Sequence, residues 1–211
     1  MGKREQSPTH MLYEQTFWER GLNVAGVDEA GRGALAGPVV AAAVVMRPHV
    51  SIPGLRDSKL VRESERERLF DHVHESAFDI RVSVVESVVV DEINILEATM
   101  VAMKTAIEAV HVGFAHVLID GNRYTGGGEF SYSTIIDGDA QVYSIAAASI
   151  IAKVTRDRIM KEWATVYPEY GFEKHKGYGT AAHYDNLRKH GRTPIHRDSF
   201  LTRLDTESRG T

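Results

Sequence analysis

The sequence has no cysteine among its 211 residues. Disulfides and thiolate metal sites are therefore excluded, and any bound metal must be held by carboxylate, imidazole or carbonyl groups. No apolar run approaches the roughly 20 residues of a membrane span, and the first 15 residues lack the apolar centre of a signal peptide. There is no internal repeat or low-complexity segment. These absences predict a soluble, cytoplasmic protein with no membrane partner.

Charge is unevenly distributed along the chain. The formal net charge of −4 is near average and excludes neither nucleic acid nor small-molecule partners. Residues 153–203, however, carry 11 Lys or Arg against 6 Asp or Glu, so the acidic excess lies in the rest of the chain. A basic C-terminal quarter could follow a phosphate backbone, or it could be an ordinary solvated helical surface.

Hydrophobic periodicity predicts strands first and helices later. Strands are expected at 24–28, 38–46 and 80–86, forming a meander, then at 115–120 and near 133–137. An amphipathic helix is expected over 91–110 with Asp91 as its N-cap, and a buried helix begins at Ala140 and ends before Pro168. No linker divides the chain. The expected fold is one α/β domain around a five-stranded mixed sheet.

The stretch GVDEAGRG, residues 26–33, places Asp28 and Glu29 directly after an apolar strand and before a glycine-rich turn. Such a turn often binds phosphate, yet two fixed negative charges repel one. Bound cations would supply the missing positive charge. Gly31, Gly33 and Ala36 also match a dinucleotide-binding fingerprint, but that motif requires a helix where a β-rich run begins instead.

Acidic residues recur at predicted strand ends, namely Asp28, Glu29, Asp120 and Asp139. Side chains at strand ends can converge, and four carboxylates could hold two Mg²⁺ or Mn²⁺ ions for phosphodiester hydrolysis. Strand alternation would direct Asp28 and Glu29 to opposite faces, although the glycines let the chain leave the sheet at Glu29. Each acid also has an ordinary interpretation: Asp137 or Asp139 as a helix N-cap, and Asp120 as a turn former.

Seven ordered stretches together resemble the ribonuclease HII family, and they cover nearly the whole chain outside its ends. They are GVDEAGRG at 26–33, DSK at 57–59, DEINIL at 91–96, LIDGN at 118–122, GDAQVYSIAAASIIAKVTRDR at 138–158, HKGYGT at 175–180 and PIHRDSF at 194–200. The resemblance implies a ribonuclease H-like fold with a helical C-terminal region. It also implies metal-dependent cleavage of RNA in RNA/DNA hybrids and 5′ to single ribonucleotides embedded in duplex DNA, leaving 3′-hydroxyl and 5′-phosphate ends.

The same resemblance assigns roles to individual residues. The four metal-binding acids of the family fall on Asp28, Glu29, Asp120 and Asp139. The Gly-Arg-Gly element that reads the ribonucleotide falls on Gly31, Arg32 and Gly33; the junction tyrosine falls on Tyr178, and Lys59 is similar to a phosphate contact. On the sequence alone, Tyr178 could equally be a core tyrosine.

Two departures from the family pattern stand out. This chain has Asp137-Gly138-Asp139 where many members have Lys-Gly-Asp, so a second acid lies beside the fourth ligand. The related ribonucleases HIII carry an extra N-terminal substrate-binding domain, for which we expect no room in this chain. We divide the chain into an N-terminal extension (1–20), a catalytic domain with a helical C-terminal part (21–204) and a flexible tail (205–211).

Two other functions stay open on the sequence: a DNA-directed nuclease of the same fold, and a module that binds nucleic acid without cutting it. The sequence identifies no protein partner.

Overall fold

The computed structural model describes residues 11–202. Five strands form one mixed sheet in the order β3-β2-β1-β4-β5. Strands β1 to β3 form an antiparallel meander, and β4 and β5 extend it in parallel from the other side of β1. The five-stranded mixed sheet expected from the sequence is confirmed. The strands are β1 (Val24–Ala30), β2 (Val39–Met46), β3 (Ala77–Val85), β4 (His116–Asp120) and β5 (Tyr132–Ile135).

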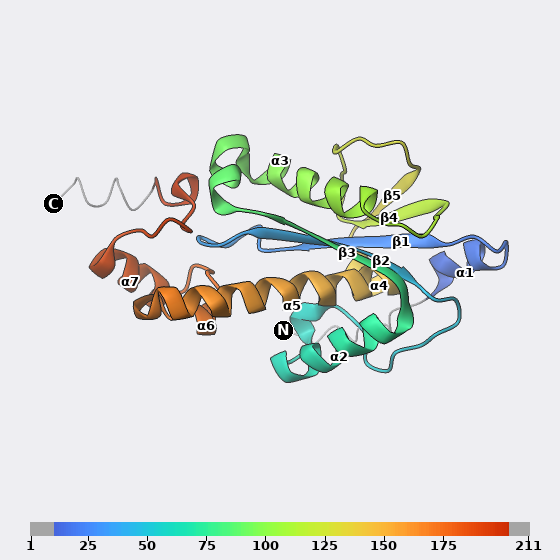
Figure 1. Ribbon diagram of the computed structural model, residues 1–211, viewed down its shortest axis with the longest axis horizontal. Helices are drawn as coiled ribbons and strands as arrows, with labels where there is room; N and C mark the ends of the chain where they lie inside the picture. The colour runs from blue at the N-terminus through green and yellow to red at the C-terminus, as the bar shows by residue number, and fades with distance from the viewer. Residues whose placement is uncertain (1–10, 203–211) are drawn as a thin grey trace, which may run out of the picture.

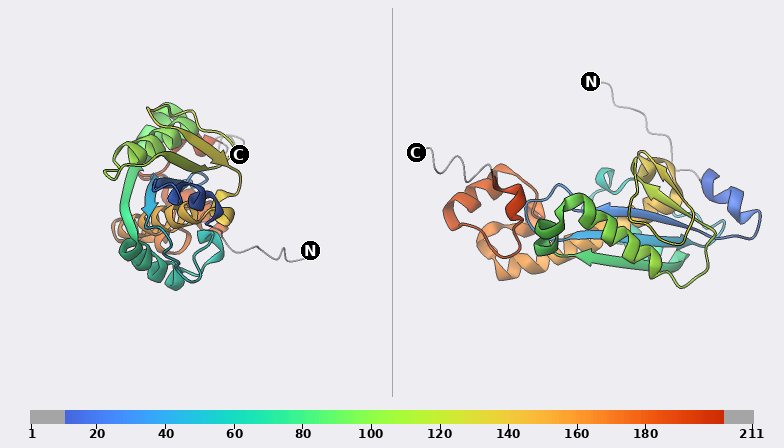
Figure 2. Two further views of the ribbon diagram at one scale, coloured as in Figure 1. Left: turned by 90° about the vertical axis from the view of Figure 1, so that its right-hand side faces the viewer. Right: turned by 90° about the horizontal axis from the view of Figure 1, so that it is seen from above.

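Helices cover both faces of the sheet. Figure 1 shows α3 on one face and α5 with α2 on the other, while α6 and α7 gather at the end of α5 farthest from α1. The end-on view in Figure 2 shows the same three layers. The helices are α1 (Leu12–Trp18), α2 (Glu63–Ser76), α3 (Ser87–Glu108), α4 (Gly138–Gln141), α5 (Tyr143–Val166), α6 (Phe172–His175) and α7 (Ala181–His190), with 3₁₀ turns η1 (Ser58–Leu60), η2 (Pro168–Tyr170) and η3 (Asp198–Phe200).

Burial follows this layering. All eight residues of β2 are buried, because its two faces pack against two separate apolar clusters. Helix α5 is buried along most of its first half, as its nearly all-apolar sequence predicts. Helix α2, with only Leu69 and Val73 buried, was not anticipated from the sequence. Within residues 11–202, no helix is both long enough and apolar enough to cross a membrane.

Helix α5 approaches β1 without an intervening side chain. A Cβ built on Gly26 would lie 2.2 Å from the backbone carbon of Ser144. The start of α5 has no capping side chain of its own, since Val142 precedes it. Instead the buried carboxylate of Glu14, on α1, accepts hydrogen bonds of 2.7 Å from both the backbone N–H and the hydroxyl of Ser144. A side chain of α1 therefore supplies the hydrogen-bond acceptor that the N-terminus of α5 lacks.

Part of the proposed division of the chain lies outside the described residues, namely 1–10 and the tail 205–211. The boundaries at residues 20 and 204 stay predictions.

The structure corrects the start of the long amphipathic helix. Helix α3 begins at Ser87, so Asp91 lies inside it and is not its N-cap. The helix is interrupted at Asn94, whose backbone has φ 68°, and the Asn94 side chain caps the following turn by accepting from the N–H groups of Leu96 and Glu97 at 2.9 and 3.1 Å. The Asp91 carboxylate instead accepts from the backbone N–H of Asp198 at 2.7 Å, which ties α3 to the C-terminal region.

We expect Gly26→Ala to destabilise the fold by about 1–3 kcal/mol, because the added methyl group must push α5 away from β1. Thermal unfolding of the purified protein measures this. Gly113→Ala is the matched control: its Cβ would meet nothing within 4 Å and its backbone needs no positive φ, so its stability should stay within about 0.5 kcal/mol of the parent. Equal melting temperatures of the two variants would show that α5 and β1 are not in close contact at Gly26.

Candidate active site

Asp28 and Glu29 are consecutive residues of β1. They pair with Ala42 and Ala41 of β2, and β1 continues to Ala30, so the expectation that the chain leaves the sheet at Glu29 is wrong. The antiparallel pairing with β2 persists through this point, and strand alternation is kept. Asp28 consequently points to the face covered by α5, and Glu29 to the face covered by α3.

Asp120 joins these two sides. It is the last residue of β4, which pairs in parallel with β1. Asp120 lines a cavity of about 210 Å³ together with Asp28 and Glu29. It also lines a smaller hollow of about 90 Å³ on the α3 side, again with Glu29. Parallel pairing thus brings three of the four predicted acids to one edge of the sheet, as expected.

The ambiguity between Asp137 and Asp139 has a structural answer. Asp139 lies inside the short helix α4 and is 4% exposed. Asp137 is exposed, has a left-handed backbone and makes no capping hydrogen bond with its side chain. Asp120 Oδ1 accepts from the backbone N–H groups of Gly138 at 2.7 Å and Asp139 at 3.4 Å. Asp139, and not Asp137, is therefore the acid held beside Asp120.

Crowded negative charge marks this region. Burial raises the pKa of Asp28 well above its usual value, and the charges of Glu29, Asp120 and Asp139 raise it further. Burial also raises the pKa values of Glu29 and Asp120. Each of these shifts reports a carboxylate that would be stabilised by additional positive charge.

Two cations partly offset the acids. Lys59 Nζ lies 3.1 Å from Asp139 Oδ2, and Arg32 Nη1 lies 3.2 Å from Glu29 Oε1. Burial lowers the pKa of Lys59, but Asp139 and the nearby Asp57 and Asp28 outweigh burial and raise it above its ordinary value. The Lys59 side chain is otherwise 73% exposed, so its ammonium group is accessible from solvent.

The acid cluster suits hard divalent cations by its chemistry, since its donors are all carboxylate oxygens. As their side chains stand, no three His, Asp or Glu residues within 11–202 surround one point that could hold a metal ion. The acids are engaged by protein groups instead: besides the contacts of Asp120, Asp139 and Glu29, Asp28 Oδ1 accepts from the backbone N–H of Glu29 at 2.7 Å.

Two glycines of the turn, Gly31 and Gly33, differ in whether the fold requires glycine there. Gly31 has φ 98°, and a Cβ there would lie 2.1 Å from Arg156 Nε, so only glycine fits. Gly33 is exposed, has no positive φ, and a Cβ there would meet nothing within 4 Å. The fold therefore gives no reason for glycine at position 33, which lies on the wall of the cavity.

Two fully buried arginines hold this turn. Arg156, on α5, donates to the carbonyl oxygens of Pro38, Ala36 and Lys176 at 2.9 to 3.0 Å. Arg197 donates twice to Gly37 and once to Arg32, also through carbonyl oxygens. Burial lowers the pKa of both, that of Arg197 to about 10, and both groups stay charged at neutral pH.

Tyr178 lies on the same cavity and is half-buried, so it is not a core tyrosine. Its ring faces the Arg156 guanidinium at 5.1 Å and the Lys153 ammonium at 5.7 Å. It forms an isolated antiparallel bridge with Ala34, directly after Gly33. The turn and the tyrosine therefore form adjoining walls of one cavity.

The structure adds three wall residues that the sequence analysis missed: Ser58, Ser149 and Lys153. Ser149 donates to Ser58 at 2.9 Å, and Lys153 pairs with Asp157. A signal was present, because Ser149, Lys153 and Asp157 recur at steps of four along one side of α5. Such a stripe on a buried helix indicates a polar partner or a cavity.

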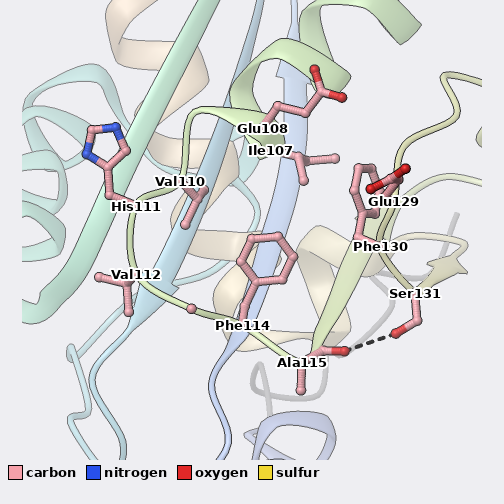
Figure 3. Close-up of a pocket in the computed structure, with 11 residues that line it drawn as sticks. Ile107, Glu108, Val110, His111, Val112, Phe114, Ala115, Glu129, Phe130 and Ser131 are labelled. Atoms are coloured by element: carbon pink, nitrogen blue, oxygen red, sulfur yellow. Dashed lines mark hydrogen bonds between the residues drawn. The ribbon is translucent and has the colours of Figure 1, made fainter.

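Another hollow lies at the other end of β4, before its first residue. Figure 3 shows Phe114 and Phe130 across it, with Glu108 and Glu129 at its rim. It measures about 440 Å³ and contains none of the residues predicted for function. The acid-lined cavity is therefore the candidate active site.

The fold is ribonuclease H-like, and comparison with known proteins identifies the family. The family model described as Ribonuclease HII matches residues 25–203. A Ribonuclease HII of Endomicrobium trichonymphae is 51% identical over 89% of this chain and 90% of its own length. One from Clostridioides difficile is 46% identical over 96% of this chain and 79% of its own. The crystal structure of the ribonuclease H2 from Pyrococcus horikoshii superimposes with a TM-score of 0.74 and 27% identity, covering 90% of this chain and all of the other.

The chain belongs to the ribonuclease HII family and is a ribonuclease H enzyme. Membership implies an endoribonuclease that acts on RNA/DNA hybrids.

Asp28→Asn should stabilise the metal-free protein at neutral pH, by about 1 kcal/mol or more, because it removes a buried charge repelled by its neighbours. Since the folded pKa of Asp28 is raised, the parent regains this stability as pH falls through that pKa. The gain should therefore shrink in acid. Thermal melts from neutral to acidic pH measure it, with the exposed Asp137→Asn as control; a destabilised Asp28→Asn at neutral pH would contradict the charge-crowding account.

Proposed function

We propose that this protein cuts on the 5′ side of single ribonucleotides embedded in duplex DNA, as well as the RNA strand of hybrids, and leaves 3′-hydroxyl and 5′-phosphate ends. One observation carries the proposal: Asp28, Glu29 and Asp120 line one cavity with an exposed glycine and a half-buried tyrosine, and Asp139 is held beside them through contacts with Asp120 and Lys59. Carboxylates serve hydrolysis, while an unobstructed backbone and an aromatic ring serve recognition of one nucleotide. The substrate partners are accordingly RNA/DNA hybrids and ribonucleotide-containing duplex DNA.

Asp28, Glu29, Asp120 and Asp139 are the residues we propose as ligands of two Mg²⁺ or Mn²⁺ ions. When bound, such ions supply the positive charge that activates a water and stabilises the leaving oxygen of the phosphodiester. The raised pKa of Asp28 supports the assignment, because carboxylates kept this close to one another gain from added positive charge. A ribonuclease HIII of the same fold was solved in complex with Mn²⁺.

Recognition of ribose needs a group close to the 2′-hydroxyl, the feature that separates RNA from DNA at one nucleotide. We assign it to the backbone of residues 31–33, where Gly33 leaves the surface open. Arg32 extends from the same turn. The ring of Tyr178 offers a flat surface for the adjoining sugar. Lys59 and Lys153 also line the cavity, and we assign them to hold phosphates, which fixes position and not sequence.

The reaction is a direct displacement at phosphorus. A water oxygen attacks the phosphate on the 5′ side of the ribonucleotide and gives up a proton to solvent, the bond to the 3′ oxygen breaks, and that oxygen takes up a proton to become the 3′-hydroxyl. No covalent enzyme intermediate is needed, because water itself is the nucleophile.

Cleavage of a duplex with one embedded ribonucleotide, beside an all-DNA duplex of the same sequence, tests the proposal. We expect a divalent-ion-dependent cut 5′ to the ribonucleotide and none in the control. Asp120→Asn and Asp139→Asn should each lower the rate by more than the roughly 10- to 100-fold typical of losing an outer-shell partner, whereas Asp137→Asn should be mild. Cleavage of the all-DNA duplex would favour the DNA-directed nuclease, and binding without cleavage would favour the non-catalytic module.

A second test concerns the reading of the ribonucleotide. Gly33→Ala should fold normally, because its methyl group meets no protein atom, and yet cleave an embedded ribonucleotide at least about 10-fold more slowly, because the methyl group occupies the space of the sugar. Tyr178→Ala should also slow this reaction with little change in divalent-ion binding. Gly113→Ala serves as the control. Full activity of both Gly33→Ala and Tyr178→Ala would refute the assigned recognition surface and leave the acid cluster unaffected.

A further inference from the structure

Three histidines cluster beside the backbone of Tyr178, and none of them lines the acid-lined cavity. His175 ends α6, His183 belongs to α7, and His196 precedes η3. His183 is fully buried and His196 is 4% exposed. They are packed among Tyr170 and Phe172. The chemistry proposed above uses none of them.

His183 and His196 form a directed chain of hydrogen bonds. The backbone N–H of Thr193 donates to His196 Nδ1 at 2.9 Å, which leaves the proton of a neutral His196 on Nε2. His196 Nε2 lies 3.0 Å from His183 Nε2, so it donates there. The proton of His183 is then on Nδ1, which lies 3.0 Å from the carbonyl oxygen of Tyr178 and donates to it. The network assigns both tautomers, and the chain ends on the backbone of Tyr178.

The surroundings keep both rings neutral. Burial and the neighbouring imidazole lower the pKa of each to about 4. His175 stacks on His183 with ring centres 4.5 Å apart, while Arg192 and Asp198 are the charged groups facing His196. A protonated pair would direct two N–H groups at each other across 3.0 Å. At neutral pH the hydrogen bonds from Thr193 through His196 and His183 to Tyr178 therefore have a single arrangement of donors and acceptors.

Gly177, which precedes Tyr178 in its loop, is hydrogen-bonded to the segment that follows the glycine turn. The carbonyl of Gly177 accepts from the N–H groups of Leu35 and Ala36 at 2.9 and 3.3 Å. A Cβ on Gly177 would lie 2.4 Å from the carbonyl oxygen of Ala36, so the two segments are in close contact. The histidine chain contacts the loop one residue further on, at the carbonyl oxygen of Tyr178. It connects the backbone of Tyr178, whose ring we assign to recognition, to α7 and the 193–197 segment.

We propose that His183 and His196 are positioning residues that hold Tyr178 in the orientation needed at the ribonucleotide, an inference that rests on the function proposed above. Neither imidazole contacts substrate. His196 fixes the tautomer of His183, and His183 fixes the backbone of Tyr178. The stacked His175 completes this support by donating to the Tyr170 carbonyl and accepting from the Gly177 N–H.

A double-mutant cycle between His183 and Tyr178 tests this role. His183→Phe keeps the ring volume and removes the Nδ1 donor, and it should slow cleavage of an embedded ribonucleotide by about 10-fold, mainly in kcat. In a Tyr178→Ala background the same change should cost less than about two-fold, because coupled residues are not additive. A purely structural histidine would cost the same factor in both backgrounds. That equality would overturn the proposal.

Two further variants complete the design. His183→Asn keeps a donor near the Nδ1 position and should restore most of the activity that His183→Phe loses. If His183→Phe fails to melt cooperatively, His196→Phe, which removes the group that sets the His183 tautomer, takes its place in the cycle. His190→Asn, an exposed histidine on the same helix α7, should leave kcat and KM unchanged. No rescue by His183→Asn would count against positioning through the Nδ1 donor.

The outcomes also separate this inference from the function on which it rests. A parent enzyme that does not cut an embedded ribonucleotide refutes both. A parent that cuts it, with additive effects in the cycle, refutes only the role of the histidines.

Discussion

The buried guanidinium of Arg156 is the contact on which the candidate site depends. Its three hydrogen bonds go to backbone carbonyl oxygens and not to a carboxylate. The acceptors are Ala36, Pro38 and Lys176, which belong to two different loops. A buried cation without such acceptors would be costly, so the loops and the arginine specify each other. The same group lies against Gly31 and faces the ring of Tyr178. One side chain of α5 thereby fixes both walls of the cavity relative to the sheet.

The acids are arranged around the edge of the sheet and not on one face. Asp28 and Glu29 alternate across β1, and Asp120, at the end of the parallel neighbour, reaches the hollows on both sides. Asp139 approaches through the backbone of α4, where Asp120 accepts from its N–H. Burial, and then the repulsion between the carboxylates, raises the pKa values of Asp28 and Asp120 in the metal-free fold. Stability and cation binding oppose one another at this edge, which is typical of a functional site.

Much of this could be predicted from the sequence, for identifiable reasons. Apolar strands that end in acids predicted the sheet and the convergence of Asp28, Glu29 and Asp120 at one of its ends, because strand period and parallel pairing are local and regular. Helix α2 and the kink at Asn94 were not predicted: α2 buries little, and a left-handed asparagine leaves no periodic signal. Asp91 was misjudged because its partners, the N–H groups of Asp198 and Ser199, are distant in sequence. The buried arginines and the paired histidines were missed for the same reason, since no pattern shows which loops a long polar side chain will join.

The spacing of the acids along the chain has a consequence for synthesis. The meander of β1, β2 and β3 needs only contacts between neighbouring segments, whereas β4 can pair with β1 only after all of α3 has been made. Asp139 and the arginine that shapes the glycine turn emerge later still. A growing chain on the ribosome thus carries Asp28 and Glu29 long before their partners exist, and the candidate active site is complete only after the last third of the chain has been made and has folded.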